Sequence, residues 1–141
     1  MPAPYTGKCL CGGVHLKISS EPVTVVSCHC GHCSKGAGGT NQVVAPFPKD
    51  DVEVTKGQEL ITTYVFTDTS SGKGKDKTFC KVCGTPLWTV TESARVQNQL
   101  LVRTVVLENG LTWKPACAIF TKNRPSWLPA ASGVVDYEAA P

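Results

Sequence analysis

Apolar and polar residues alternate along most of this chain, and a period of two predicts β-strands. In the segment VHLKIS, Val14, Leu16 and Ile18 share one face, while His15 and Lys17 share the other. Further runs rich in β-branched and aromatic residues occupy residues 52–54, 60–68, 87–91, 99–107 and 116–122. Glycine, proline, asparagine and aspartate separate the runs, as is typical of turns between strands. The pattern therefore predicts a mostly β, largely antiparallel fold.

Helical patterns are few and short. Residues 34–37, 48–54 and 91–99 could each hold a turn or two. The chain has 141 residues, which is typical of one domain, and we find no internal repeat or linker. The glycine- and lysine-rich segment 69–77 joins two predicted strands and is expected to be a solvated loop, although its lysines could attract an anion. The proline-rich tail from Pro125 is expected to wrap the surface.

Composition narrows the classes of function. The net charge is +3 and the pI is about 8.4, with no basic stripe or extension, so we expect no nucleic-acid partner. No apolar run approaches the roughly 18 residues that span a bilayer, and the first residues lack the pattern of a signal peptide. The sequence therefore predicts a soluble, cytoplasmic protein without a membrane partner.

Eight cysteines are the most informative feature of the composition. In a reducing compartment, clustered cysteines more often bind metal or act in catalysis than form disulfides, and the absence of an export signal weighs against the disulfide alternative. Seven of the eight form three groups, CLC, CHCGHC and CKVCG.

The first and last groups predict one closed metal centre. Cys9 and Cys11 are two residues apart, so on a strand they would share a face. Cys80 and Cys83 form a C-x-x-C turn followed by Gly84, which is the shape of a zinc knuckle. Together these four thiols complete a tetrahedral zinc shell, and we expect that shell to be structural.

The middle group offers only three sulfurs, from Cys28, Cys30 and Cys33. Three protein ligands with an open fourth position are typical of a catalytic zinc. His29, His32 and Cys117 are alternative fourth ligands that would close the site.

The ligand type indicates the chemistry. Three thiolates donate much electron density, so such a zinc acidifies a bound water weakly and suits another sulfur better. A substrate thiol at the fourth position would be held as a thiolate nucleophile, and the reverse reaction would accept a thiolate leaving group. We therefore expect a substrate that carries sulfur.

The motifs GKCLCGGV, CHCGHC and FCKVCGTPLW, in this order, resemble the glutathione-dependent formaldehyde-activating enzyme family, which includes centromere protein V. The likeness extends from Gly7 to Leu128. It implies a β-tent of coiled sheets with two zinc ions. It also implies glutathione as co-substrate and different roles for the two sets of thiols. The structural set is Cys9, Cys11, Cys80 and Cys83, and the catalytic set is Cys28, Cys30 and Cys33. The implied activity is that of a carbon–sulfur lyase or synthase, which makes or breaks S-(hydroxymethyl)glutathione.

Several questions stay open at the level of sequence. The electrophile could be formaldehyde, a larger aldehyde or a related compound, and the thiol could differ from glutathione. His29 or His32 could transfer a proton to or from the alkoxide that develops during such a reaction. Cationic side chains could bind the carboxylates of glutathione, and the candidates are Lys35, Arg103, Lys122 and Arg124. The rival hypothesis is a non-catalytic β module, stabilised by two zinc ions, that binds a protein or nucleic acid.

Overall fold

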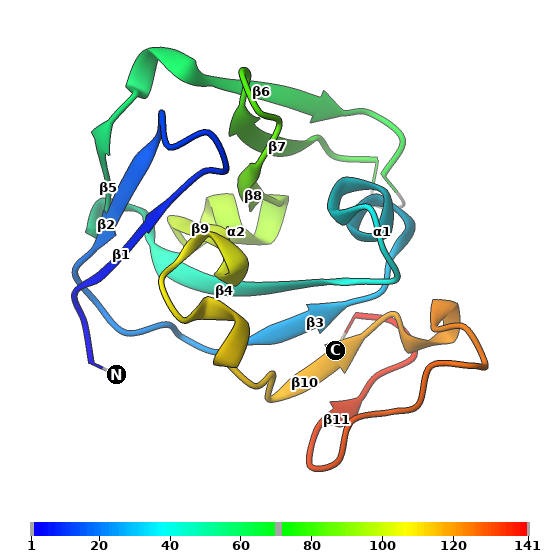
Figure 1. Cartoon of the computed structure of the whole chain (residues 1–141). Coiled ribbons are helices and arrows are strands. Elements are labelled where there is room, and N and C mark those ends of the chain that lie inside the picture. The colour runs from blue at the N-terminus through cyan, green and yellow to red at the C-terminus, as the bar shows by residue number, and fades with distance from the viewer. Residues whose placement is uncertain (1, 70–71, 141) are drawn as a thin grey trace.

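The computed structural model describes residues 2–69 and 72–140, and within them the fold is mostly β (Figure 1). A three-stranded antiparallel sheet has the order β1-β2-β5. An eight-stranded sheet has the order β11-β10-β3-β4-β9-β8-β7-β6. In the larger sheet, β10 pairs in parallel with both β3 and β11, and the other pairs are antiparallel. The predicted fold class is confirmed.

The strands are short. The smaller sheet consists of β1 (Tyr5–Lys8), β2 (His15–Ile18) and β5 (Val52–Lys56). The larger sheet consists of β3 (Val26–Cys28), β4 (Gln42–Pro48), β6 (Ile61–Phe66), β7 (Lys75–Cys80), β8 (Pro86–Val90), β9 (Gln99–Arg103), β10 (Cys117–Ile119) and β11 (Val135–Asp136).

Both α-helices and the first 3₁₀ turn fall in or near the predicted helical segments, whereas the other four 3₁₀ turns were not predicted. The helices are α1 (Gly31–Ala37) and α2 (Glu92–Val96), with 3₁₀ turns at Lys49–Asp51, Gln58–Leu60, Thr104–Val106, Gly110–Thr112 and Thr121–Asn123. In the region 69–77, residues 70 and 71 lie outside the described part of the chain. Residues 75–77 of that region belong to β7 rather than to a loop.

The predicted strand over residues 99–107 ends early. The chain leaves the sheet after Arg103 and makes a 3₁₀ turn, and Leu107 then bridges to Gly7 of β1. Gly7 permits this approach, since a Cβ atom there would lie 2.4 Å from the Val106 carbonyl oxygen. The turn thus connects the two sheets and leaves Arg103 at the end of a buried strand.

The prediction missed β4, because Pro46 and Pro48 interrupt its apolar pattern. Proline cannot donate to a β-ladder and is normally confined to edges. Strand β3 pairs only with residues 42–44, so the second half of β4 is free on that side. There the carbonyl of Pro46 accepts a hydrogen bond from Val23 N (2.9 Å) instead.

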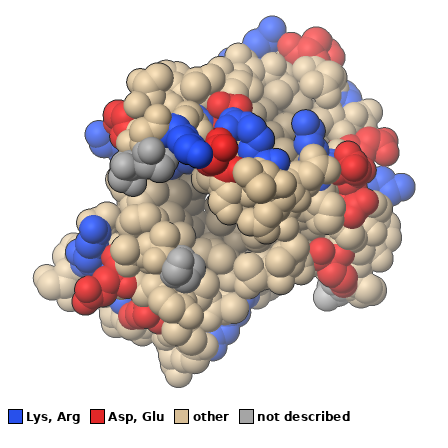
Figure 2. Space-filling model, turned by 180° about the vertical axis from the view of Figure 1, so that it is seen from behind, with Lys and Arg blue, Asp and Glu red and all other residues tan. Residues whose placement is uncertain are grey.

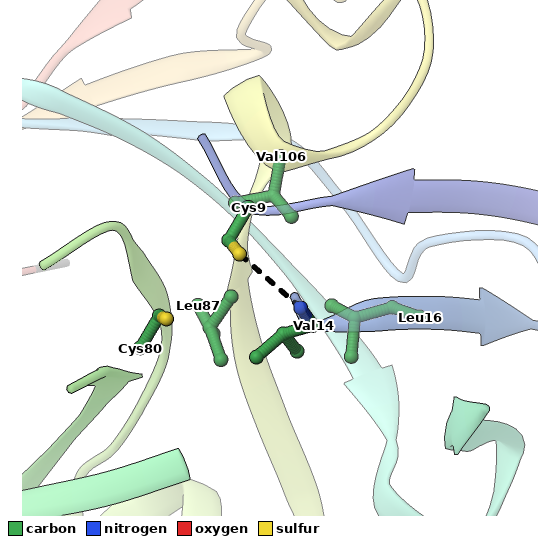
Figure 3. Packing of buried hydrophobic residues seen from close by; sticks show 6 residues of the cluster. All are labelled: Cys9, Val14, Leu16, Cys80, Leu87 and Val106. Atoms are coloured by element: carbon green, nitrogen blue, oxygen red, sulfur yellow. Dashed lines mark hydrogen bonds between the residues drawn. The ribbon is translucent and has the colours of Figure 1, made fainter. Parts of the chain in front are cut away.

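Two apolar clusters form the core. One surrounds Phe47 and Val102 in the larger sheet, together with Ile18 from the smaller one. The other contains Cys9 and Cys80 and lies between the two sheets. Figure 3 shows the sulfurs of these cysteines among apolar side chains of that cluster, namely Val14, Leu16, Leu87 and Val106. Thiols are thus part of the hydrophobic core.

Replacing Phe47, which is 0% exposed, by alanine should lower the free energy of unfolding by about 3–5 kcal/mol, because the cavity left behind adds to the lost transfer energy. Val96→Ala is the control, since Val96 is 77% exposed and the change should cost less than about 0.5 kcal/mol. Urea unfolding of both variants measures the difference. Equal losses of unfolding free energy in the two variants would contradict a core centred on Phe47.

Candidate metal centres

The sulfurs of Cys9, Cys11, Cys80 and Cys83 all lie within 4.8 Å of one another and could hold a metal ion. Cys9 and Cys11 lie 3.5 Å apart and Cys11 and Cys80 lie 3.9 Å apart, measured between sulfurs. Zn–S bonds of about 2.3 Å place tetrahedral neighbours about 3.8 Å apart, so the donor set fits zinc.

Two turns bring these sulfurs together. Cys9 and Cys11 lie in the turn that follows β1, where Gly12 N donates to Cys9 O (3.0 Å), so they converge through a turn and not along one strand face. Cys80 ends β7, and Gly84 N donates back to Cys80 O (2.8 Å) with φ of 77° at Gly84. The glycine therefore permits the tight knuckle that the sequence predicts.

Hydrogen bonds stabilise negative charge on these thiols. The Val14 amide donates to Cys9 Sγ (3.3 Å). The Thr85 hydroxyl lies 3.2 Å from Cys83 Sγ, and its hydrogen bond is the main cause that lowers the pKa of Cys83 to about 5. Thiolate is the form that binds a metal, so these hydrogen bonds favour the metal-binding form of Cys9 and Cys83.

The sulfurs of Cys28, Cys30 and Cys33 form a second cluster within 4.8 Å. Cys28 ends β3, and Cys30 is the N-cap of α1, where its sulfur accepts a hydrogen bond from Cys33 N (3.3 Å). Hydrogen bonding with Cys28 lowers the pKa of Cys30 to about 2, while the pKa of Cys28 is raised. A thiolate on Cys30 is the form that binds a metal.

A glutamine that the sequence analysis did not single out also contacts this cluster. Gln42 of β4 pairs with Cys28 of β3 in the sheet register, and its Nε2 donates to Cys33 Sγ (2.8 Å). Gln42 is buried, and its hydrogen bond holds the Cys33 sulfur in place. No motif in the sequence points to it, because the register of β3 and β4 brings it to the site.

Within the described residues, no further His, Cys, Asp or Glu side chain joins the three sulfurs. Neither His29 nor His32 belongs to the cluster, and Cys117 of β10 does not either. A fourth coordination position would thus be available to an added ligand.

The two histidines lie in different surroundings. His32 stacks on Phe66, with ring centroids 4.3 Å apart, and its Nε2 lies 3.2 Å from Asp68 Oδ1. His29 is 4% exposed, its Nδ1 has no partner among the described residues, and burial lowers its pKa.

His29 lines a cavity with Arg124 that includes none of the three cysteines. Arg124 forms a bidentate ion pair there with Asp136, with N–O distances of 2.8 and 2.9 Å. Arg124 thus has a partner for its charge within the chain.

A cavity of about 580 Å³ opens at the second cluster. Cys30 and His32 line it with the apolar side chains of Leu101, Ile119 and Phe120 and the basic side chains of Lys73 and Lys75. Phe120 has φ of 55°, an unfavourable value for an aromatic residue and one found more often at functional sites. The exposed Lys35 and Lys122 do not line this cavity, nor do Arg103 and Arg124.

Arg103 is 4% exposed and lies near the same three thiols. Burial lowers the pKa of its guanidinium to about 10, while the charges of Cys33, Cys28 and Cys30 act in the opposite direction. Burial and the charge of Arg103 also lower the pKa of Lys77. The guanidinium of Arg103 therefore lies near a cluster of three thiols that would carry negative charge with a metal bound.

Basic and acidic side chains are interspersed on the face shown in Figure 2, and they do not form a continuous basic stripe there. Among the described residues, no helix has the length and apolar character needed to cross a membrane.

No curated protein matches this chain. A crystal structure of a Rhodobacter sphaeroides protein is similar in fold, with a TM-score of 0.60 and 20% identity over 94% of this chain and 98% of that one. The family model described as glutathione-dependent formaldehyde-activating enzyme matches residues 4–123. Since that model spans most of the chain, the protein belongs to the glutathione-dependent formaldehyde-activating enzyme family.

Proposed function

We propose that this protein is a zinc-dependent carbon–sulfur lyase or synthase that acts on the glutathione adduct of an aldehyde or related electrophile. The observation that carries the proposal is the second cluster, whose three sulfurs have no fourth ligand among the described residues and whose Cys30 lines a cavity of about 580 Å³. Family membership supports glutathione as the thiol.

The same proposal assigns different roles to the two clusters. Cys9 and Cys80 are buried in the core, which supports a structural zinc at the first centre. Cys28, Cys30 and Cys33 would hold the catalytic zinc, which supplies a soft fourth position for a thiolate sulfur.

The reaction itself is an addition. The sulfur of the thiol forms a bond with the carbonyl carbon, the π bond of the carbonyl breaks, and the thiol proton ends on the carbonyl oxygen. In the lyase direction the C–S bond breaks, and the hydroxyl proton returns to the sulfur.

His32 is the residue that we assign to this proton transfer. It lines the same cavity as Cys30, whereas His29 does not. The contact with Asp68 fixes the ring and favours a proton on Nε2, the nitrogen that faces the carboxylate. General acid–base catalysis by such a group typically contributes about 10²–10⁴-fold to the rate.

Basic residues in the cavity are suited to the two carboxylates of glutathione. Lys75 lines it, with Nζ 5.0 Å from the ring centroid of Phe66. Lys73 lines it too, with its Nζ 3.8 Å from Oε1 of Glu92, which also lines the cavity. We favour Lys73 and Lys75 because both line the cavity that contains Cys30. The contacts expected from sequence do not line it, namely Lys35, Arg103, Lys122 and Arg124.

The proposal extends to the organisation of the chain, which would form one zinc-binding domain with the segment from Pro125 as its surface tail. The protein would act in the cytoplasm. Its partners would be small molecules rather than nucleic acid.

Cys30→Ser should retain the fold and one zinc per chain but lose turnover of S-(hydroxymethyl)glutathione. Cys80→Ser should instead unfold the protein or lower its melting temperature strongly, because binding of a structural zinc contributes directly to folding free energy. Metal analysis, thermal unfolding and a turnover assay on both variants test the division. Equal destabilisation by the two changes would contradict it.

His32→Gln should lower kcat about a hundredfold without loss of metal, because it removes the proton-transfer group from the cavity. His29→Gln is the comparison, and its kcat per folded, metal-loaded molecule should stay within about threefold of the parent, since His29 lines another cavity. If the two variants lose activity to the same extent, His32 has no special role in proton transfer.

A further inference from the structure

A second cavity adjoins the three-sulfur cluster on the side of Gln42 and Arg103. Its volume is about 290 Å³, and it shares no lining residue with the cavity that contains Cys30. Much of its wall is apolar, formed by Val43, Pro86, Val105, Leu111 and Trp113. We call it the Arg103 cavity.

Arg103 lines this cavity and has hydrogen-bond donors that the protein does not use. The side chain is 4% exposed, and its Nε and Nη1 are fully buried with no partner among the described residues. A guanidinium carries five N–H donors in a planar fork that matches a carboxylate. The neighbouring thiols balance its charge at a distance, but none of them accepts a hydrogen bond from Nε or Nη1.

Gln42 adds an unpartnered acceptor. Its Nε2 donates to Cys33 Sγ (2.8 Å), which fixes the amide and leaves the buried Oε1 without a donor among the described residues. Buried polar atoms in folded proteins nearly always have partners, and both side chains line this cavity, so a molecule bound there is the candidate partner.

We propose that the Arg103 cavity binds a small organic acid, whose carboxylate pairs with Arg103 and whose apolar body packs against Leu111 and Trp113. A hydroxyl or N–H group on that acid would satisfy Gln42 Oε1. The site does not depend on the carbon–sulfur chemistry proposed above.

The occupant is a molecule other than glutathione. The cavity has half the volume of the one at Cys30, about 290 against 580 Å³. Its apolar wall and the single cation Arg103 suit a monocarboxylate, whereas glutathione carries two carboxylates and an amine. Glutathione must also present its sulfur at Cys30, which lines the other cavity.

Butyrate and its neutral isostere butyramide test the site on the full-length, metal-loaded protein. Amide resonances in a ¹⁵N–¹H spectrum are followed during titration. Butyrate should shift the amides of residues 110–113 and 41–43, and butyramide should bind at least about tenfold more weakly, because charge-assisted hydrogen bonds are the stronger ones. Arg103→Met, checked for retained metal, should abolish the difference between the two probes.

Leu111 provides a matched set of charge variants that leaves Arg103 intact. It is 85% exposed on the wall of the cavity, so substitution there should not disturb the fold or the metal content. Leu111→Glu should raise the Kd for butyrate about threefold or more and Leu111→Lys should lower it, both less so in about 1 M salt. Leu111→Gln is the neutral control and should fall between them.

Three results would overturn the proposal. Butyrate and butyramide could bind equally, or the shifts could cluster around Lys75 and Cys30. Displacement of butyrate by glutathione would assign the carboxylate at Arg103 to glutathione itself. Loss of carbon–sulfur turnover with butyrate binding intact would instead contradict the proposed function and leave this site standing.

Discussion

The structure depends on the convergence of thiols from distant parts of the chain. Cys9 and Cys11 meet Cys80 and Cys83 within 4.8 Å, although about seventy residues separate them. Seven sulfurs in two such clusters cannot all carry a negative charge without a cation, because like charges at that distance repel. The first cluster is also continuous with the apolar core, so a metal bound there and the packing of the two sheets would stabilise each other.

The second cluster differs in what surrounds it. Its sulfurs extend from the end of β3 into the first turn of α1, and the sheet behind them contributes Gln42 and Arg103. A three-thiolate zinc would carry one net negative charge, and a buried guanidinium offsets that charge. We infer that this balance allows both groups to be buried together, where either alone would be costly.

Two cavities adjoin the same centre with different walls. The cavity at Cys30 is larger and has two lysines and a histidine, whereas the Arg103 cavity is smaller and largely apolar. The separation would allow two chemically distinct molecules to bind near one metal centre.

The sequence alone determined the fold class and the grouping of the cysteines, because a period of two and C-x-x-C spacing are local properties of the chain. Only the tertiary structure decided which distant side chains reach the second cluster. Sheet register placed Gln42 beside Cys33, and the early end of β9 left Arg103 buried near it. Such contacts depend on strand pairing across long sequence separations, for which a single sequence carries no local signal.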